Sequence, residues 1–312
     1  MNIKLTALYC AATLFYTTLY AENNEKPEEP STTEFVILIA SYNNEQYCER
    51  NLASVVWQKS SRPFQVIVIN DCSTDKTAER LNEFVRNNNL ESRVTLIHNS
   101  ERYGSLKNIY TTLHTLVDDH KVVVSVDGDD QLISDSVLLR LEQEYKNPSI
   151  HLTYGSFIQS STGRRGKARK IPDEIIRTRR VRKLTTFKAH HLKTFRAGLF
   201  KKIKKEDLML NENFFSATGD LAFMYPMIEM LAPVEENEPD HTAFIREILY
   251  KHNDENPIND FRIHRKKQQF FRRYIRRQKP YEPLDKKIFL TNKKRKTRKK
   301  SKELPVKVYQ GN

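Results

Sequence analysis

The strongest constraint on the fold is a regular alternation of short apolar runs and longer amphipathic ones between residues 34 and about 154. The short runs are rich in branched apolar residues and predict strands at 35–40, 65–70, 94–98 and 121–126. The stretches between them place apolar residues at helical spacing and predict helices at 44–58, 74–86 and 105–117. Because these strands are apolar on both faces, we expect an α/β fold with a mostly parallel, Rossmann-like sheet flanked by helices.

Polar residues follow the predicted strands directly. They are Ser41, Tyr42 and Asn43 after the first strand, Asn70 and Asp71 after the second, and Asp127, Asp129 and Asp130 after the fourth. In parallel sheets, ligands bind beyond the carboxyl ends of the strands, so these ends predict the site.

The turn Asp127-Gly128-Asp129-Asp130 crowds three carboxylates at the end of a buried strand. Such carboxylates repel one another unless they share a cation, and their hard oxygens suit Mg²⁺ or Mn²⁺ together with substrate phosphates. The turn therefore favours a metal-dependent enzyme acting on a phosphorylated substrate. The alternative is a solvated acidic turn.

The first strand end argues against two classes of nucleotide enzyme. The Gly-rich dinucleotide fingerprint is missing there, because the chain reads Ala40-Ser41-Tyr42-Asn43-Asn44. A nucleotidyltransferase would need a basic phosphate-binding loop, and residues 41–45 contain no Lys or Arg.

The N-terminal residues have the composition of a targeting segment. Lys4 precedes an apolar run that extends to Leu19, and the small residue Ala21 marks a possible cleavage point. We predict that residues 1–21 are a signal peptide or an uncleaved anchor, followed by an acidic, Pro-containing linker at 22–33. The expected location is exported or membrane-associated, and a cytoplasmic orientation stays open.

Two further segments are strongly basic, in a chain whose formal net charge is +14. Residues 163–183 are interpreted as a mobile loop, either simply solvated or closing over an anionic ligand. In the tail at 261–312, residues 268–277 predict an amphipathic helix and residues 293–302 a disordered end. The tail suits an anionic membrane surface, and a nucleic-acid partner is not expected. The alternative is a soluble tail without a specific partner.

Taken together, these landmarks resemble the family 2 glycosyltransferases of GT-A fold, over roughly residues 34–260. The matching segments are the first strand with its Tyr42-Asn43 turn, the stretch from Val66 to Asp75, Gly104 with Asn108, and Val126 to Asp130. Two departures stand out. Asn70 and Cys72 replace the usual Asp and Gly of the second segment, so the turn there must accept a side chain.

The resemblance implies an inverting, metal-dependent transfer of a hexosyl or N-acetylhexosaminyl group from a UDP- or GDP-linked donor. The acceptor would be a hydroxyl of a glycan, lipid or protein. Mn²⁺ or Mg²⁺ would be held by Asp129 and Asp130 and act as a Lewis acid on the diphosphate. The implied donor-binding residues are Ala40, Tyr42, Asn43, Asp71, Asn108, Asp127, Asp129, His191, Arg196 and His252.

Asp220 is implied as the general base that takes the proton of the attacking hydroxyl, and its usual acidic neighbour is here Gly219. Structural alternatives accompany these roles. Asp220 could cap the following helix, Asp71 or Asp75 could cap the helix after the second strand, and His191 could be structural. The alternative functions are a non-catalytic binding protein that uses its basic tail and a nucleotidyltransferase on a similar fold.

Overall fold

The computed structural model describes residues 33–235, 237–258, 265–285 and 307–308. The predicted leader at 1–21, all but the last residue of the linker, and the predicted disordered end at 293–302 lie outside the described residues. Within the described residues, no helix is long and apolar enough to span a bilayer.

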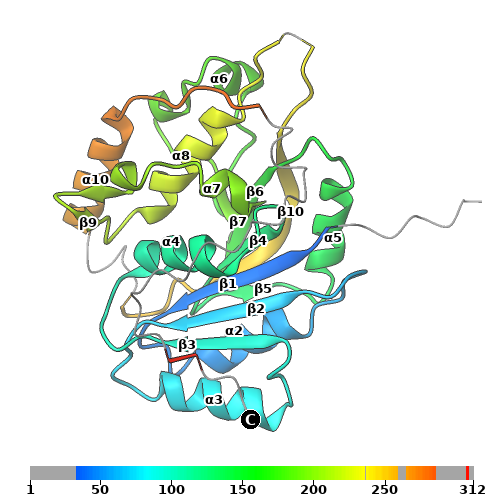
Figure 1. Ribbon diagram of the computed structural model, residues 1–312, viewed down its shortest axis with the longest axis vertical. Helices are drawn as coiled ribbons and strands as arrows, with labels where there is room; N and C mark the ends of the chain where they lie inside the picture. The colour runs from blue at the N-terminus through cyan, green and yellow to red at the C-terminus, as the bar shows by residue number, and fades with distance from the viewer. Residues whose placement is uncertain (1–32, 236, 259–264, 286–306, 309–312) are drawn as a thin grey trace, which may run out of the picture. The chain divides into compact units, whose positions relative to one another are not determined.

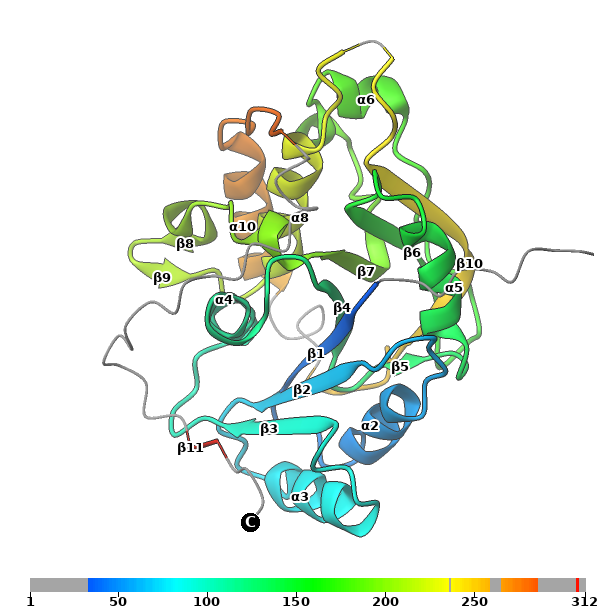
Figure 2. The same ribbon diagram turned by 45° about the vertical axis from the view of Figure 1, so that its right-hand side comes forward.

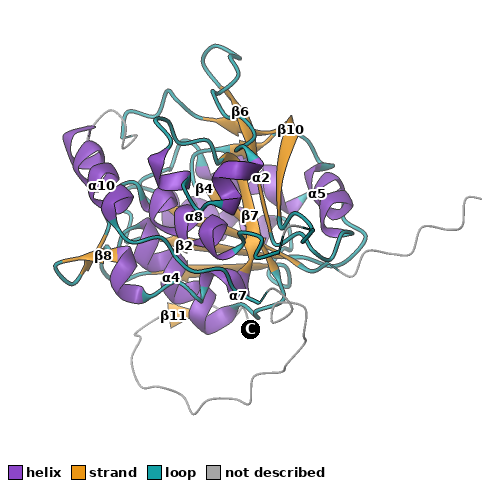
Figure 3. Cartoon of the chain, turned by 90° about the horizontal axis from the view of Figure 1, so that it is seen from above, coloured by secondary structure: helices purple, strands orange, loops and turns teal. Residues whose placement is uncertain are grey.

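Among the described residues, the core of the fold is a sheet of nine strands in the order β11-β3-β2-β1-β4-β7-β6-β10-β5. The four predicted strands are confirmed as β1 (Phe35–Ser41), β2 (Gln65–Asn70), β3 (Val94–His98) and β4 (Val122–Asp127), and they pair in parallel. The remaining strands are β5 (Gln131–Leu132), β6 (Leu152–Gln159), β7 (His190–Arg196), β10 (Thr242–His252) and β11 (Lys307–Val308). β7 runs antiparallel between β4 and β6, while β6 and β10 are parallel neighbours (Figure 3).

Helices cover both faces of this sheet (Figures 1 and 2). One face carries α2 (Cys48–Val56), α3 (Thr77–Asn87) and α5 (Val137–Tyr145), and the other carries α4 (Ser105–Leu116), α8 (Gly219–Met230) and α10 (Arg265–Arg277). Successive residues of β1 point to opposite cores: Ile37 and Ile39 pack with the first set, Val36 and Leu38 with the second. Burial on both faces explains why these strands contain no polar alternation.

Smaller elements connect these layers. They are the short helices α6 (Asp173–Arg177) and α7 (Ala197–Phe200), the 3-10 turns Val181–Lys183 and Lys205–Leu208, and the hairpin of β8 (Met209–Leu210) and β9 (Asn213–Phe214).

The basic segment 163–183, interpreted as a mobile loop, is loop as far as residue 172 but is then partly helical, and it contributes to the core. It contains α6 and a 3-10 turn, and it buries Ala168, Ile171, Ile176 and Val181. These apolar residues are few among many charged ones, and Pro172 interrupts their spacing, so the sequence does not mark them clearly as core residues.

Arg182 of the same segment contacts both α8 and α10, through a buried ion pair and a hydrogen bond. Arg182 Nε lies 2.7 Å from Glu229 Oε1, and the two side chains are 3% and 0% exposed. Arg182 also donates from Nη1 to the backbone carbonyl of Ile275 in α10, at 2.6 Å. Burial raises the pKa of Glu229, although the Arg182 hydrogen bonds oppose that shift. The predicted amphipathic helix is therefore confirmed as α10, and its Phe271 and Ile275 join the core beside α8.

Candidate active site

The acidic turn after β4 is held rigidly by its neighbours. Asn51 of α2 donates from Nδ2 to the backbone carbonyls of both Asp127 and Asp130, at 2.8 Å each. Gly128 lies directly against Ser41 at the end of β1, where a Cβ atom would come within 2.7 Å of the Ser41 side chain. Glycine is required here because the two strand ends approach so closely.

We expect Gly128→Ala to destabilise the fold by about 1–3 kcal/mol, because the added methyl group must displace the turn or β1. Urea unfolding measures this loss. The double variant G128A/S41G removes part of the clash and should recover part of the stability. A Gly128→Ala protein as stable as the wild type would contradict the close approach.

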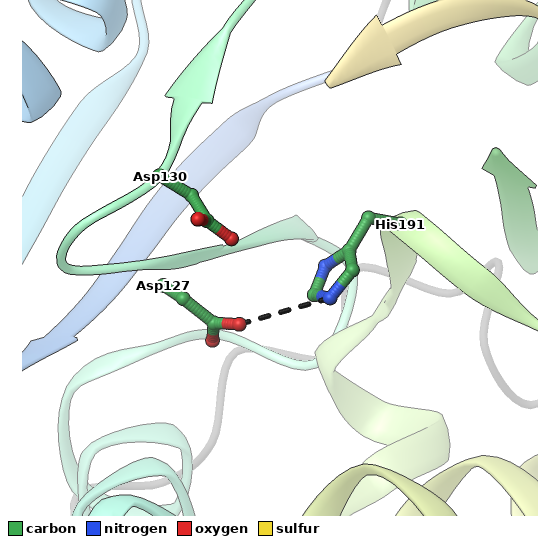
Figure 4. Close-up of side chains that lie close together, drawn as sticks. All are labelled: Asp127, Asp130 and His191. Atoms are coloured by element: carbon green, nitrogen blue, oxygen red, sulfur yellow. Dashed lines mark ion pairs between the residues drawn. The ribbon is translucent and has the colours of Figure 1, made fainter. Parts of the chain in front are cut away.

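Three potential ligand side chains converge at this edge of the sheet: Asp127, Asp130 and His191 (Figure 4). One ligand atom from each lies within 4.8 Å of the others, and His191 Nε2 is 3.7 Å from Asp127 Oδ2. The register of β4 and β7 produces this meeting. Ser125 pairs with Lys193, so two residues further along His191 comes opposite Asp127.

The Asp130 carboxylate is buried and organised by the end of β10. Its Oδ1 accepts from the backbone N–H of Asn253 at 2.6 Å, and its Oδ2 lies 3.1 Å from His252 Nδ1. Desolvation alone would lower the pKa of His252, but the hydrogen bond to Asp130 and the nearby carboxylates raise it. Tyr250 accepts from the backbone N–H of Asp127 at 3.0 Å, and its ring stacks on His191 with centroids 4.4 Å apart.

Burial and neighbouring negative charge raise the pKa of the Asp127 and Asp129 carboxyl groups. Desolvation, followed by the charge of Asp130, raises the pKa of Asp127 to about 6 and that of Asp129 to about 7. Burial and the Lys193 ammonium hold the pKa of His191 well below its ordinary value, so its imidazole is neutral. A neutral imidazole and two carboxylates in mutual repulsion form a ligand set that fits a divalent cation such as Mn²⁺.

Asp129 lies outside this three-residue set, although the sequence placed it in the metal pair with Asp130. Its Oδ2 accepts from Asn256 Nδ2 at 2.7 Å. The structure therefore brings Asp127 and His191 to Asp130, and it joins Asp129 to the segment after β10.

Asp220 faces the same space from the first turn of α8. Asp127, His191, Lys193, Asp220 and His252 all line one cavity of about 650 Å³. Asp220 Oδ1 accepts from the N–H of Leu221 at 2.9 Å, and its Oδ2 is 3.6 Å from Lys193 Nζ. Asp220 thus contacts the helix start and also reaches the cavity, so both roles considered for it are geometrically compatible.

Lys193 is a site residue that sequence reasoning missed. It is 4% exposed, and its Nζ lies between Asp220 and His191, 3.3 Å from His191 Nε2. The available signal was its two-residue spacing from His191, which puts both side chains on one face of a strand. The sequence predicts no strand there, so this spacing alone does not indicate that the two side chains share a face.

The Asp71 carboxylate is fully engaged by the loop before α4. It accepts from Asn99 Nδ2 and from the backbone N–H groups of Tyr103 and Gly104, at 2.8–2.9 Å. Asn99 also donates to Asn108 Oδ1 at 2.8 Å, so Asp71 and Asn108 belong to one network. Just before the helix after β2, Asp75 Oδ1 accepts from the N–H of Thr77, the first residue of α3, at 3.0 Å, while the N-cap position itself is Lys76.

The first strand end supplies three of the predicted donor-binding residues. Ala40 pairs with Asp127 in the β1–β4 register. Asn43 Oδ1 accepts from the Thr74 N–H at 2.8 Å and so ties this turn to the one after β2. The Tyr42 ring is covered by the Arg102 guanidinium at 3.7 Å.

Arg196 is not brought to this site. It pairs with Val122 at the opposite end of β4 and donates to the carbonyl of His120 at 2.9 Å.

Cys72 does occupy a left-handed conformation with φ of 58°, so this turn accepts a side chain where glycine is favoured.

Comparison with known proteins supports the assignment of fold and family. S. aureus TarS (its residues 1–349, in complex with UDP-GlcNAc) is 18% identical with a TM-score of 0.50, and the match covers 71% of this chain and 58% of that one. The mannosyltransferase PcManGT from Pyrobaculum calidifontis, in complex with GDP-Man and Mn²⁺, is 18% identical with a TM-score of 0.53, covering 89% and 76%. No curated protein matches the chain. The sequence profile of glycosyl transferase family 2 matches residues 36–204, more than half of the chain. The fold is thus the expected GT-A fold, and the chain belongs to glycosyl transferase family 2.

Proposed function

We propose that the protein transfers a sugar from a UDP- or GDP-linked donor to a hydroxyl acceptor, with inversion at the sugar carbon and with a divalent cation. One observation carries this proposal: Asp127 and His191 of the Asp127–Asp130–His191 cluster line a single cavity together with Asp220. The similar structures were obtained with UDP-GlcNAc and with GDP-Man and Mn²⁺, which supports hexosyl or N-acetylhexosaminyl transfer here.

In this proposal Asp127, Asp130 and His191 hold the cation, and the imidazole in the set favours Mn²⁺ over Mg²⁺. The cation, when bound, neutralises charge on the diphosphate leaving group. Lys193 and His252 line the same cavity and add positive charge beside the departing phosphates.

Asp220 is proposed to accept the proton of the attacking hydroxyl. Asp220, in the first turn of α8, lies on the wall of the cavity that Asp127 and His191 also line. Attack assisted from that wall, with the diphosphate leaving toward the cluster, is an in-line displacement and inverts the sugar carbon.

The nucleotide site can be tested with a thermal-shift assay. We expect UDP or GDP to raise the melting temperature only with Mn²⁺, and a ligand at 100 times its Kd adds about 2.7 kcal/mol of stability. Asp127→Asn should abolish the Mn²⁺-dependent part of this shift because it removes one ligand.

The matched control is Asp135→Asn, since Asp135 pairs with Lys59 on the surface and does not line the cavity. This variant should behave like the wild type. If UDP or GDP raises the melting temperature equally with and without Mn²⁺, and equally in the wild type and Asp127→Asn, the proposed site is refuted.

A further inference from the structure

Helix α10 carries an unusual density of positive charge beside the catalytic cavity. Between Arg265 and Arg277 it contains no acidic residue. Its basic residues are Arg265, Lys266, Lys267, Arg272, Arg273, Arg276 and Arg277. None of them forms an ion pair with a carboxylate of the described part of the chain. The described carboxylates therefore do not neutralise the charge of α10.

Part of α10 forms the wall of the active cavity. Arg265, Gln268, Gln269 and Arg272 line the same 650 Å³ space as Asp127 and Asp220. A second cavity of about 520 Å³ is lined by Gln269, Arg272, Arg273, Arg276 and Arg277. The two spaces share Gln269 and Arg272, so a continuous basic surface leads away from the catalytic cavity. We call the second cavity the α10 groove.

Two arginines of the groove are fixed in place. Arg272 donates to the Thr185 carbonyl at 3.1 Å, and Arg276 donates from Nε to the Arg182 carbonyl at 2.8 Å. Burial raises the pKa of the Tyr225 hydroxyl. The charges of Arg276 and Arg272 oppose this shift, and the charge of Asp220 adds to it. The groove and the candidate base therefore share one electrostatic environment.

We propose that the α10 groove binds the acceptor, and that the acceptor is a glycan chain carrying repeated phosphate or carboxylate groups. This inference rests on the proposed function. The donor diphosphate is accounted for by the Asp127–Asp130–His191 cluster, whereas the groove extends from the wall that holds Asp220. A chain lying in the groove meets Arg273 and Arg277 outside and presents its terminal hydroxyl to Asp220 inside.

A flat membrane fits this geometry less well than a chain. The arginine and glutamine side chains of α10 line two adjoining spaces, and one of these spaces contains the candidate catalytic residues. A linear anionic polymer can follow both spaces, while a planar lipid surface can contact only their outer rim.

The test uses the full chain, with inorganic polyphosphate and polygalacturonate as the two anionic probes and dextran as the neutral one. We expect both anionic probes to bind, to bind more weakly at higher salt, and dextran not to bind. The variant R273E/R277E leaves the anchored Arg272 and Arg276 in place and should weaken binding of the anionic probes about 10-fold or more. Preference for one probe identifies phosphate or carboxylate as the recognised group.

The matched control is R62E/R86E, which makes the same charge change at exposed positions remote from both cavities. It should retain probe affinity, and melting temperatures verify that both variants fold. If both double variants lose the same affinity for the anionic probes, or if R273E/R277E loses none, the proposal is overturned.

Two further results separate this proposal from others. The first is that the wild type binds phosphatidylcholine vesicles containing phosphatidylserine, that R273E/R277E loses this binding, and that the polyanions do not bind. This result would overturn the acceptor proposal and identify the ligand of the α10 groove as a membrane surface. The Mn²⁺-dependent nucleotide shift is measured on the same samples. If it is present without groove binding, only this inference fails; if it is absent, the acceptor role fails together with the proposed function.

Discussion

Replacing Asp220 by Asn is expected to lower the turnover of sugar transfer by about 10²–10⁴-fold, the usual contribution of a general base. The amide has the same shape and can still accept from the Leu221 N–H, so α8 should keep its start. Because Asp220 is not part of the Asp127–Asp130–His191 cluster, Mn²⁺-dependent binding of UDP or GDP should be retained. Steady-state kinetics and nucleotide titration measure the two effects separately.

Two variants separate the chemistry of Asp220 from a purely structural role. Asp220→Ser retains an oxygen that can accept from the helix start, so it should keep stability but not turnover. Asp118→Asn changes an exposed carboxylate away from the cavity and should have wild-type activity. Full turnover in folded Asp220→Asn would remove this residue from the mechanism.

Arg182→Met is expected to lower the free energy of unfolding by about 3–5 kcal/mol, because it leaves the Glu229 carboxylate buried without its partner. Arg182 also holds the carbonyl of Ile275, and Glu229 accepts from the Tyr281 N–H at 3.1 Å. The loss should therefore reach α10, and faster amide exchange in α10 should accompany the change in urea unfolding.

The double variant R182M/E229L provides the control, since it replaces both charges by apolar groups. It should be more stable than Arg182→Met, because no uncompensated charge remains. If the single and double variants lose equal stability, the effect comes from packing and not from the ion pair.

The sequence predicted the first half of the sheet well and the second half poorly. β1 to β4 are buried on both faces, so their apolar runs are unmistakable. β7 instead alternates between core residues and cavity residues, with Lys193 between Leu192 and Thr194. No strand was predicted for β6, β7 or β10, because polar residues interrupt the apolar pattern of each.

The candidate site was predicted in the right turn but not in atomic detail. Consecutive acidic residues in a turn point in directions set by its backbone, which the sequence does not reveal. Asp130 therefore turned out to be the buried, shared carboxylate, and Asp129 bonds Asn256. The α10 arginines could not be assigned from the sequence, because only the tertiary fold brings Arg265 and Arg272 to the cavity, and the spacing of Lys193 from His191 has meaning only once β7 is known to be a strand.

The buried carboxylate of Asp130 receives its hydrogen bonds from residues 122 and 123 positions later in the chain. During synthesis, the acidic turn must therefore wait for the last long strand before its charge is satisfied. A fragment ending at residue 204, where the family profile stops, would lack His252 and Asn253 and leave this charge bare. The cluster thus takes its final form only after the C-terminal part of the chain has folded onto the N-terminal part.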